Sequence, residues 1–159
     1  MHNHQGGNEV SQLMYIIGVS VFMDYGCDGS GANTQNTVSN SFKNVFDYTS
    51  ATYGNYLLGA VINNLNQNKP VILRGGRKSS WFIFSVYTDG HAWVADGYRR
   101  YKICHYNENG DAYAYNNITY LRMNWGWDGS LNGWFRADNW NPGNYTFNYQ
   151  RGMVYNITP

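Results

Sequence analysis

Two short runs of the sequence carry side chains that could perform acid–base chemistry. His91 follows Gly90 and opens an apolar stretch, and further along the chain Asn124 precedes Trp125-Gly126-Trp127. An imidazole is the side chain best suited to act as a base near neutral pH. An amide oxygen that accepts the imidazole N–H would fix its tautomer and ring angle. We therefore expect His91 to be a general base and Asn124 its orienting partner, with Trp125 and Trp127 excluding water from the pair.

Each of these residues also has a structural interpretation. A single histidine in a strand is more often structural than catalytic, and a Trp-Gly-Trp segment could form an aromatic core cluster or a platform on which sugars stack. Gly90 leaves the backbone beside His91 open, and Trp93 and Val94 can anchor the strand that follows. These neighbours favour the catalytic interpretation of His91.

The chain has two cysteines, Cys27 and Cys104, which are too few for a four-cysteine metal site. No metal or cofactor is therefore expected. One disulfide, two buried thiols, or one reactive and one inert thiol all remain open, and the sequence favours buried free thiols. Cys27 lies in a glycine-rich loop and is expected to be the more exposed of the two, whereas Cys104 lies in a strand-like alternation.

Length and composition indicate one domain spanning residues 1–159, with residues 1–8 expected to be disordered. Only 13% of the residues are charged and the net charge is +1, so neither nucleic acid nor an anionic membrane is an expected partner. No apolar run is long enough to span a bilayer. The amino terminus shows no signal peptide, although a processed chain would lack one as well.

The periodicity of apolar residues predicts helices in the first part of the chain and strands in the rest. One helix is expected after Asn8 as N-cap, with an apolar stripe that ends at Gly18. A second helix is expected from near Thr34, and a third over 53–66, before Pro70 forbids continuation. Asn109-Gly110 predicts a tight hairpin. Strands are expected over 71–74, 81–87, 91–95, 98–106, 118–124, 133–136 and 153–157. The sequence thus predicts an α+β fold, with helices packed on a coiled antiparallel sheet.

Several motifs occur in an order that is specific in combination. They are Gly18-Val19-Ser20-Val21-Phe22-Met23-Asp24-Tyr25-Gly26, Gly29-Ser30-Gly31, Lys69-Pro70-Val71, Gly90-His91-Ala92-Trp93-Val94-Ala95-Asp96-Gly97, Asn124-Trp125-Gly126-Trp127 and Asn132-Gly133-Trp134-Phe135. From about residue 10 to its end, the chain resembles the carboxy-terminal part of the catalytic domain of the streptopain family of bacterial cysteine peptidases.

The resemblance implies a papain-like fold, export from a bacterium and cleavage of peptide or protein substrates by a thiolate. It implies that His91 is the catalytic histidine, that Trp125 and Trp127 are active-site tryptophans, and that Asn124 begins their motif. Met23, Gly90 and the segment 141–150, which includes Tyr145, are expected near the substrate. The stretch 77–84 departs from the compact family spacing and is expected to extend a hairpin at the rim of the cleft.

The front of the chain departs from the family pattern. The family's nucleophilic cysteine follows a glycine and opens a long helix, whereas Gly26-Cys27 is followed by a glycine-rich loop and not by a helical pattern. Cys27 falls where the family has a loop residue, so the chain alone is expected to be inactive. Three interpretations remain: the base-carrying part of a peptidase that a missing Cys-bearing segment completes, an independent inactive relative that binds peptides or proteins, or a glycan-binding module. An apolar groove left by the missing helix would favour the first.

Overall fold

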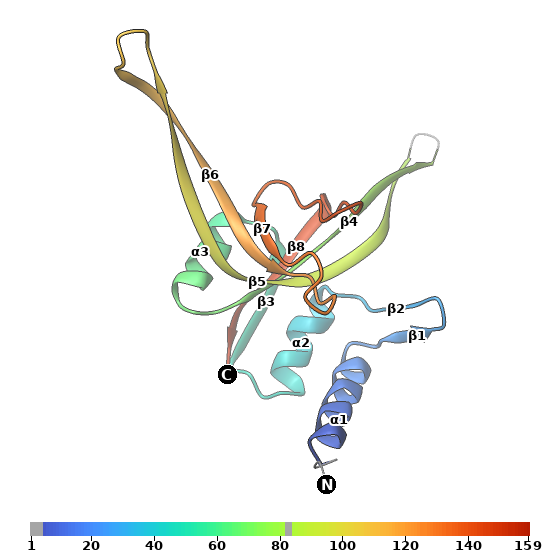
Figure 1. The fold of residues 1–159 in the computed structure, drawn as a ribbon. Coiled ribbons are helices and arrows are strands. Elements are labelled where there is room, and N and C mark those ends of the chain that lie inside the picture. The colour runs from blue at the N-terminus through green and yellow to red at the C-terminus, as the bar shows by residue number, and fades with distance from the viewer. Residues whose placement is uncertain (1–4, 82–83) are drawn as a thin grey trace.

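The computed structural model describes residues 5–81 and 84–159, which form three helices and two antiparallel sheets (Figure 1). In chain order the elements are α1 (Gln5–Ser20), β1 (Asp24–Gly26), β2 (Gly29–Gly31), α2 (Asn36–Asn44), β3 (Ser50–Asn55), α3 (Leu58–Asn66), β4 (Val71–Trp81), β5 (Phe84–Tyr106), β6 (Ala112–Asn124), β7 (Gly133–Arg136) and β8 (Tyr149–Thr158). The larger sheet has the strand order β3-β8-β4-β5-β6-β7, and β1 pairs with β2. The α+β class predicted from the sequence is confirmed.

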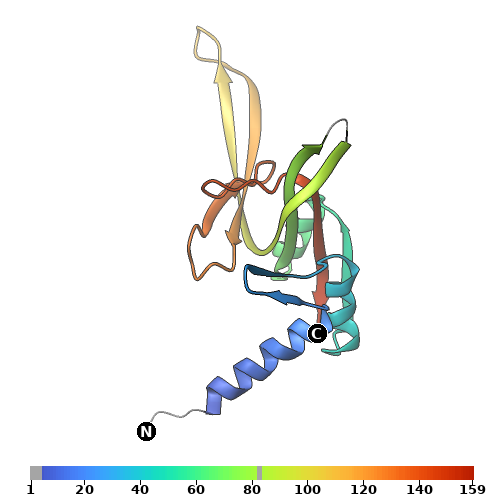
Figure 2. The same cartoon turned by 90° about the vertical axis from the view of Figure 1, so that its right-hand side faces the viewer.

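The strand β5 is the longest element and belongs to two hairpins that extend away from the body of the molecule (Figures 1 and 2). The sequence predicted three strands over this region, but the structure joins them into one strand whose register shifts between Ala95 and Gly97. The β5–β6 hairpin closes at the predicted Asn-Gly turn, where Gly110 has a φ of +84°. The β4–β5 hairpin continues to the pair Trp81↔Phe84, so residues 77–81 extend it, while residues 82 and 83 of the 77–84 stretch lie outside the described residues.

The hydrophobic core lies on one face of the larger sheet. Alternate residues of β5 and β6 supply much of it, because successive side chains of a strand point to opposite faces. The buried cluster consists of Val61, Val71, Leu73, Trp93, Ala95, Leu121, Met123, Trp125, Ala137, Trp140, Phe147 and Met153. The loop between β7 and β8 contributes Trp140 and Phe147, so this loop packs against the buried residues of the sheet.

The structure changes the expected bounds of two helices. The helix predicted over 53–66 is wrong in its first part: 50–55 forms β3, which pairs with β8, and only Leu58–Asn66 is helical. β-Branched and aromatic residues such as Thr52 and Tyr53 favour a strand when a partner strand is available. The first helix begins at Gln5 and not after Asn8, and it continues past Gly18. Residues 5–8, expected to be disordered, form its first turns, and residues 1–4 lie outside the described residues.

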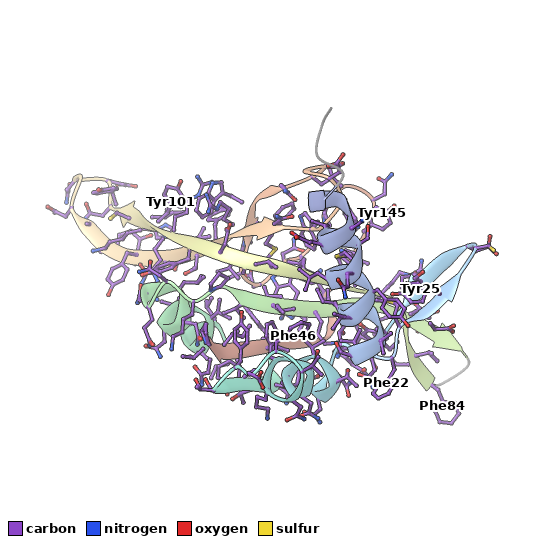
Figure 3. All side chains as sticks on the ribbon, turned by 90° about the horizontal axis from the view of Figure 1, so that it is seen from below. Phe22, Tyr25, Phe46, Phe84, Tyr101 and Tyr145 are labelled. Atoms are coloured by element: carbon purple, nitrogen blue, oxygen red, sulfur yellow. The ribbon has the colours of Figure 1, made fainter. Side chains whose placement is uncertain are left out.

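The helix α1 packs against α2 and projects away from the larger sheet (Figure 2). Its apolar side chains are largely in contact with solvent; Val10 is 61% exposed and Met14 is 60% exposed. Phe22, which follows the helix, is 80% exposed (Figure 3). Among the described residues, no helix is both long enough and apolar enough to cross a membrane.

Candidate active site

His91 lies on β5, where this strand pairs with β4. The end of β6 pairs with β5 a few residues further along, at Val94. Its Nε2 atom is 2.8 Å from the backbone carbonyl oxygen of Trp125. A carbonyl oxygen can only accept a hydrogen bond, so Nε2 carries the hydrogen and donates it. The other ring nitrogen, Nδ1, is then left unprotonated and can accept a proton from a substrate or a nucleophile.

Aromatic rings surround the imidazole of His91. The ring of Trp127 stacks on it at 4.8 Å between centroids, and the ring of Phe147 lies at 5.4 Å. Trp93 and Trp125 are next, at 6.1 and 6.4 Å. Trp125 and Trp127 are thus beside His91, as expected. Trp125 is fully buried, so its indole cannot serve as a platform for sugars.

Burial controls the protonation of His91. Removal of the ring from water lowers the pKa of His91 below its ordinary value, and the hydrogen bond to the carbonyl of Trp125 opposes this only in part. The neutral imidazole, which is the form that can accept a proton, is therefore the stable one near neutral pH.

The structure does not place Asn124 against His91. Its side-chain oxygen accepts a hydrogen bond from the backbone N–H of Gly126 at 3.0 Å. Asn124 pairs with Val94, which puts it on the outward face of the sheet, whereas His91 shares the inward face with Trp93. The expected contact between the amide of Asn124 and the imidazole is wrong, because the alternation of the strand places them on opposite faces.

The carbonyl that orients His91 is held by the loop after β6. The amide oxygen of Asn132 accepts the backbone N–H of Trp125 at 2.9 Å. Gly126 and Gly129 have φ values of +76° and +82°, in the region that favours glycine. Asn124 and Asn132 therefore act on the backbone around Trp125, and this backbone in turn fixes the imidazole.

The chain is similar to known proteins of one peptidase family. The model of the Peptidase C10 family matches residues 1–135. The chain belongs to this family of peptidases. It is 29% identical to streptopain from Streptococcus pyogenes serotype M1 and 28% identical to streptopain from Streptococcus pyogenes, over 165 aligned residues in each case. Each alignment covers 94% of this chain and 35% of the relative.

A solved structure shows the same fold. The active wild-type interpain A cysteine protease of Prevotella intermedia superposes with a TM-score of 0.66 and 29% sequence identity. The match covers 96% of this chain and 57% of the interpain A chain. The expected resemblance to streptopain and the papain-like fold are confirmed. The chain spans about a third of the length of its streptopain relatives.

A pocket of about 480 Å³ lies beside His91. We call it the His91 pocket; it is lined by Met23, Ser30, Gly31, Ala32, Asn33, Thr34, Gln35, Arg74, Tyr87, Gly90, His91, Ala92 and Gln150. Met23 and Gly90, which were expected near the substrate, line this pocket. Tyr145 does not, because its ring lies against the ring of Trp127 at 5.1 Å. Tyr145 therefore packs on the tryptophan that stacks on His91 and not in the pocket.

Gln150 lines the His91 pocket and belongs to the segment 141–150 that was expected near the substrate. Among the lining residues that sequence reasoning missed are Arg74 and Tyr87. One signal was available, since Arg74 interrupts an apolar strand and is followed by two glycines. A Cβ atom on Gly76 would lie 2.6 Å from the ring of Tyr87. The glycine is therefore needed for the close approach of that ring to β4.

Neither cysteine lines the His91 pocket. Both are free; Cys27 is exposed in the turn between β1 and β2, and Cys104 is half-buried on β5. The expectation of buried thiols is thus wrong for Cys27, although it is the more exposed of the two, as predicted. Within residues 5–81 and 84–159, no three His, Cys, Asp or Glu side chains gather as metal ligands would.

A second pocket, of about 460 Å³, adjoins the first. We call it the apolar groove. It shares Met23, Ala32 and Thr34 with the His91 pocket and runs between α1, α2 and β4 (Figure 3, in which Phe46 is labelled). Its lining is completed by Leu13, Ile17, Val21, Val38, Ser41, Phe42, Phe46, Tyr48 and Ile72.

Proposed function

We propose that this chain is the base-carrying part of a streptopain-like cysteine peptidase and that a segment bearing the nucleophilic cysteine completes it. The observation that carries the proposal is the imidazole of His91, which is oriented through Nε2 by the carbonyl of Trp125 and lines a pocket. The substrate would be a peptide or a protein, as for other cysteine peptidases.

The chemistry follows from the free nitrogen. A thiol within hydrogen-bond distance of Nδ1 would transfer its proton to the imidazole, and the thiolate would attack the carbonyl carbon of a peptide bond. The imidazolium would then give this proton to the leaving amine. A water molecule, losing a proton to the neutral imidazole, would hydrolyse the thioester and restore the thiol. Trp127, stacked on His91, would limit the access of bulk water to the ion pair.

The apolar groove supports the partial nature of this site. An apolar surface of this kind is usually covered by another element. The groove meets the His91 pocket at Met23, Ala32 and Thr34, so a helix seated in the groove could present its first residue to Nδ1. A cysteine at the start of a helix has the lowered pKa that a nucleophilic thiol requires.

We also propose export from a bacterial cell, on family grounds alone.

Two experiments test the proposal. Purified chain is first incubated with a fluorogenic peptide and with a thiol-reactive peptide mimic. We expect no turnover and labelling of Cys27 that does not change in His91→Ala. The chain is then mixed with the part of streptopain that precedes the matched region, and peptide hydrolysis is expected to appear. It should be lost in His91→Ala and retained in His105→Ala, which removes a histidine distant from the pocket on the β5–β6 hairpin.

Turnover by the chain alone that disappears in both Cys27→Ser and His91→Ala would contradict the proposal. In that case Cys27, and not an added segment, would supply the nucleophile.

A further inference from the structure

Arg74 is a buried cation that lines the His91 pocket. It is 8% exposed, and within the described part of the chain no carboxylate forms an ion pair with it. Its Nε atom donates to the hydroxyl of Thr34 at 3.1 Å, and Nη1 lies 3.4 Å from both the hydroxyl of Tyr53 and the carbonyl oxygen of Gln150. All three acceptors are neutral. Buried guanidinium groups are normally paired with an anion, so this arrangement is unusual.

The surroundings of Arg74 favour an anion. It lines the His91 pocket, and none of the residues that line this pocket is an aspartate or a glutamate. Several polar side chains around it can donate hydrogen bonds, namely Ser30, Asn33, Thr34, Gln35 and Gln150. The hydroxyl of Tyr87 already donates to the carbonyl oxygen of Gly75 at 2.9 Å. Asp89, near the pocket in sequence, is already paired with Arg77 at 2.7 Å. The pocket therefore carries positive charge that the described residues do not neutralise.

The contacts of Arg74 leave part of its guanidinium free. Its three hydrogen bonds to the described residues use Nε and Nη1, and Nη2 takes no part in them. The ring of Tyr87 lies over the guanidinium at 5.0 Å and holds its plane. A fixed, planar guanidinium recognises carboxylates with good geometry.

We propose that Arg74 is a specificity-determining residue that binds a carboxylate of a peptide seated in the His91 pocket. This inference rests on the proposed function, because it takes the pocket beside His91 as the place where a substrate lies. The carboxylate could be a glutamate or aspartate side chain or the carboxy terminus of the peptide. A purely structural Arg74 would explain its bonds to Thr34, Tyr53 and Gln150, but it would not explain a pocket that lacks every acidic side chain.

The test is a binding experiment that needs no thiol. The full 159-residue chain is titrated in a calorimeter with acetylated, amidated pentapeptides in which one glutamate is moved through each position, and with the matching glutamine set. A third set has glutamine and a free carboxy terminus. We expect the best carboxylate peptide to bind about tenfold or more tightly than its neutral match, since a hydrogen bond to a buried charge has this value.

Three variants locate the effect. Arg74→Met should bring the ratio of carboxylate to neutral affinities close to one, and Arg74→Lys should keep part of it. Arg77→Met removes the same charge from the adjacent, exposed part of β4 and should leave the ratio unchanged. If Arg74→Met fails to fold, Arg74→Lys decides. The lysine keeps the positive charge but lacks the planar donors of the guanidinium, so the ratio of affinities should fall only in part. Thermal melts check the fold of each variant.

The outcomes separate the sources and the hypotheses. Preference for an internal glutamate identifies the side chain as the ligand, and preference for the free carboxy terminus identifies that group. A ratio near one in the wild-type chain, a ratio that survives in Arg74→Met, or no binding by any peptide would overturn the inference. Failure of the added segment to restore hydrolysis would count against the proposed function but would leave this measurement unaffected.

Discussion

At the scale of single residues, the protonation of His91 is open to direct measurement. Because burial lowers the pKa of His91 below the ordinary histidine value of about 6.5, its NMR titration midpoint should lie below that value. The unfolded chain then binds a proton at a higher pH than the folded chain does. The free energy of unfolding should therefore fall as the pH decreases below about 6.5. Thermal melts between pH 7.5 and 5.5 would show a steeper loss in the wild-type chain than in His91→Gln.

Trp127→Ala serves as a matched control for this measurement. It uncovers one face of the imidazole, and the midpoint should move back toward the ordinary value. A wild-type midpoint at or above that value, or equal loss of stability in the wild-type chain and His91→Gln, would contradict the account of His91 as a neutral base.

The residues around His91 could be predicted from the sequence only in part. His91, Trp125 and Trp127 do meet, because the two tryptophans directly follow β6, which pairs with the strand of His91. The orienting group was missed because it is a backbone carbonyl, and a backbone carbonyl leaves no mark on residue type. Alternation in β6 could have warned against Asn124: Leu121, Met123 and Trp125 are buried, and the residue between the last two must face outward.

At the scale of elements, the strand β4 brings together the base and the pocket. Gly75 pairs with His91, and it passes so close to the loop before β8 that an added Cβ would overlap the carbonyl oxygen of Phe147. Gly75→Ala should therefore destabilise the protein by about 1–3 kcal/mol, the usual cost of overpacking. In a domain of this size the melting temperature should fall by roughly 2–4 °C for each kcal/mol.

Gly133→Ala on β7 is the matched control, because no atom lies within 4 Å of its added Cβ. Its effect should stay within about 0.5 kcal/mol, as for most surface substitutions. Equal melting temperatures for the two variants would show that β4 and the Phe147 loop can separate without cost.

Secondary structure was predictable where it is local and less so where it depends on distant partners. The Asn109-Gly110 turn and the helix α3 carry their own signals, a turn dipeptide and an apolar stripe. The strand β3 carries a weak signal and exists because β8, at the end of the chain, lies beside it. Arg74 was missed for the same reason: its burial follows from contacts with residues distant in sequence, Thr34, Tyr53 and Gln150.

At the scale of the whole molecule, α1 packs against α2 and leaves much of its apolar surface uncovered. It is a 16-residue helix, and most of the stability of a helix in a protein comes from the packing of its apolar face. Several of its apolar side chains are exposed, among them Val10, Leu13 and Val19. The apolar groove at its side, lined by Leu13 and Ile17, would be filled by the proposed Cys-bearing segment. The stability of α1 should therefore depend on whether that segment is present.

Hydrogen–deuterium exchange can measure this dependence. In the chain alone, amides of α1 should exchange faster than those of α3, although α3 has only nine residues, because Val61 and Ile62 anchor α3 in the core. When the part of streptopain that precedes the matched region is added, exchange in α1 should slow, while exchange in α3 should stay unchanged. Exchange in α1 as slow as in α3 before any addition would mean that something already covers the helix. Sedimentation of the same sample would then show whether the cover is a second copy of the chain, in which case the groove would be an interface between copies and not the seat of the nucleophile-bearing helix.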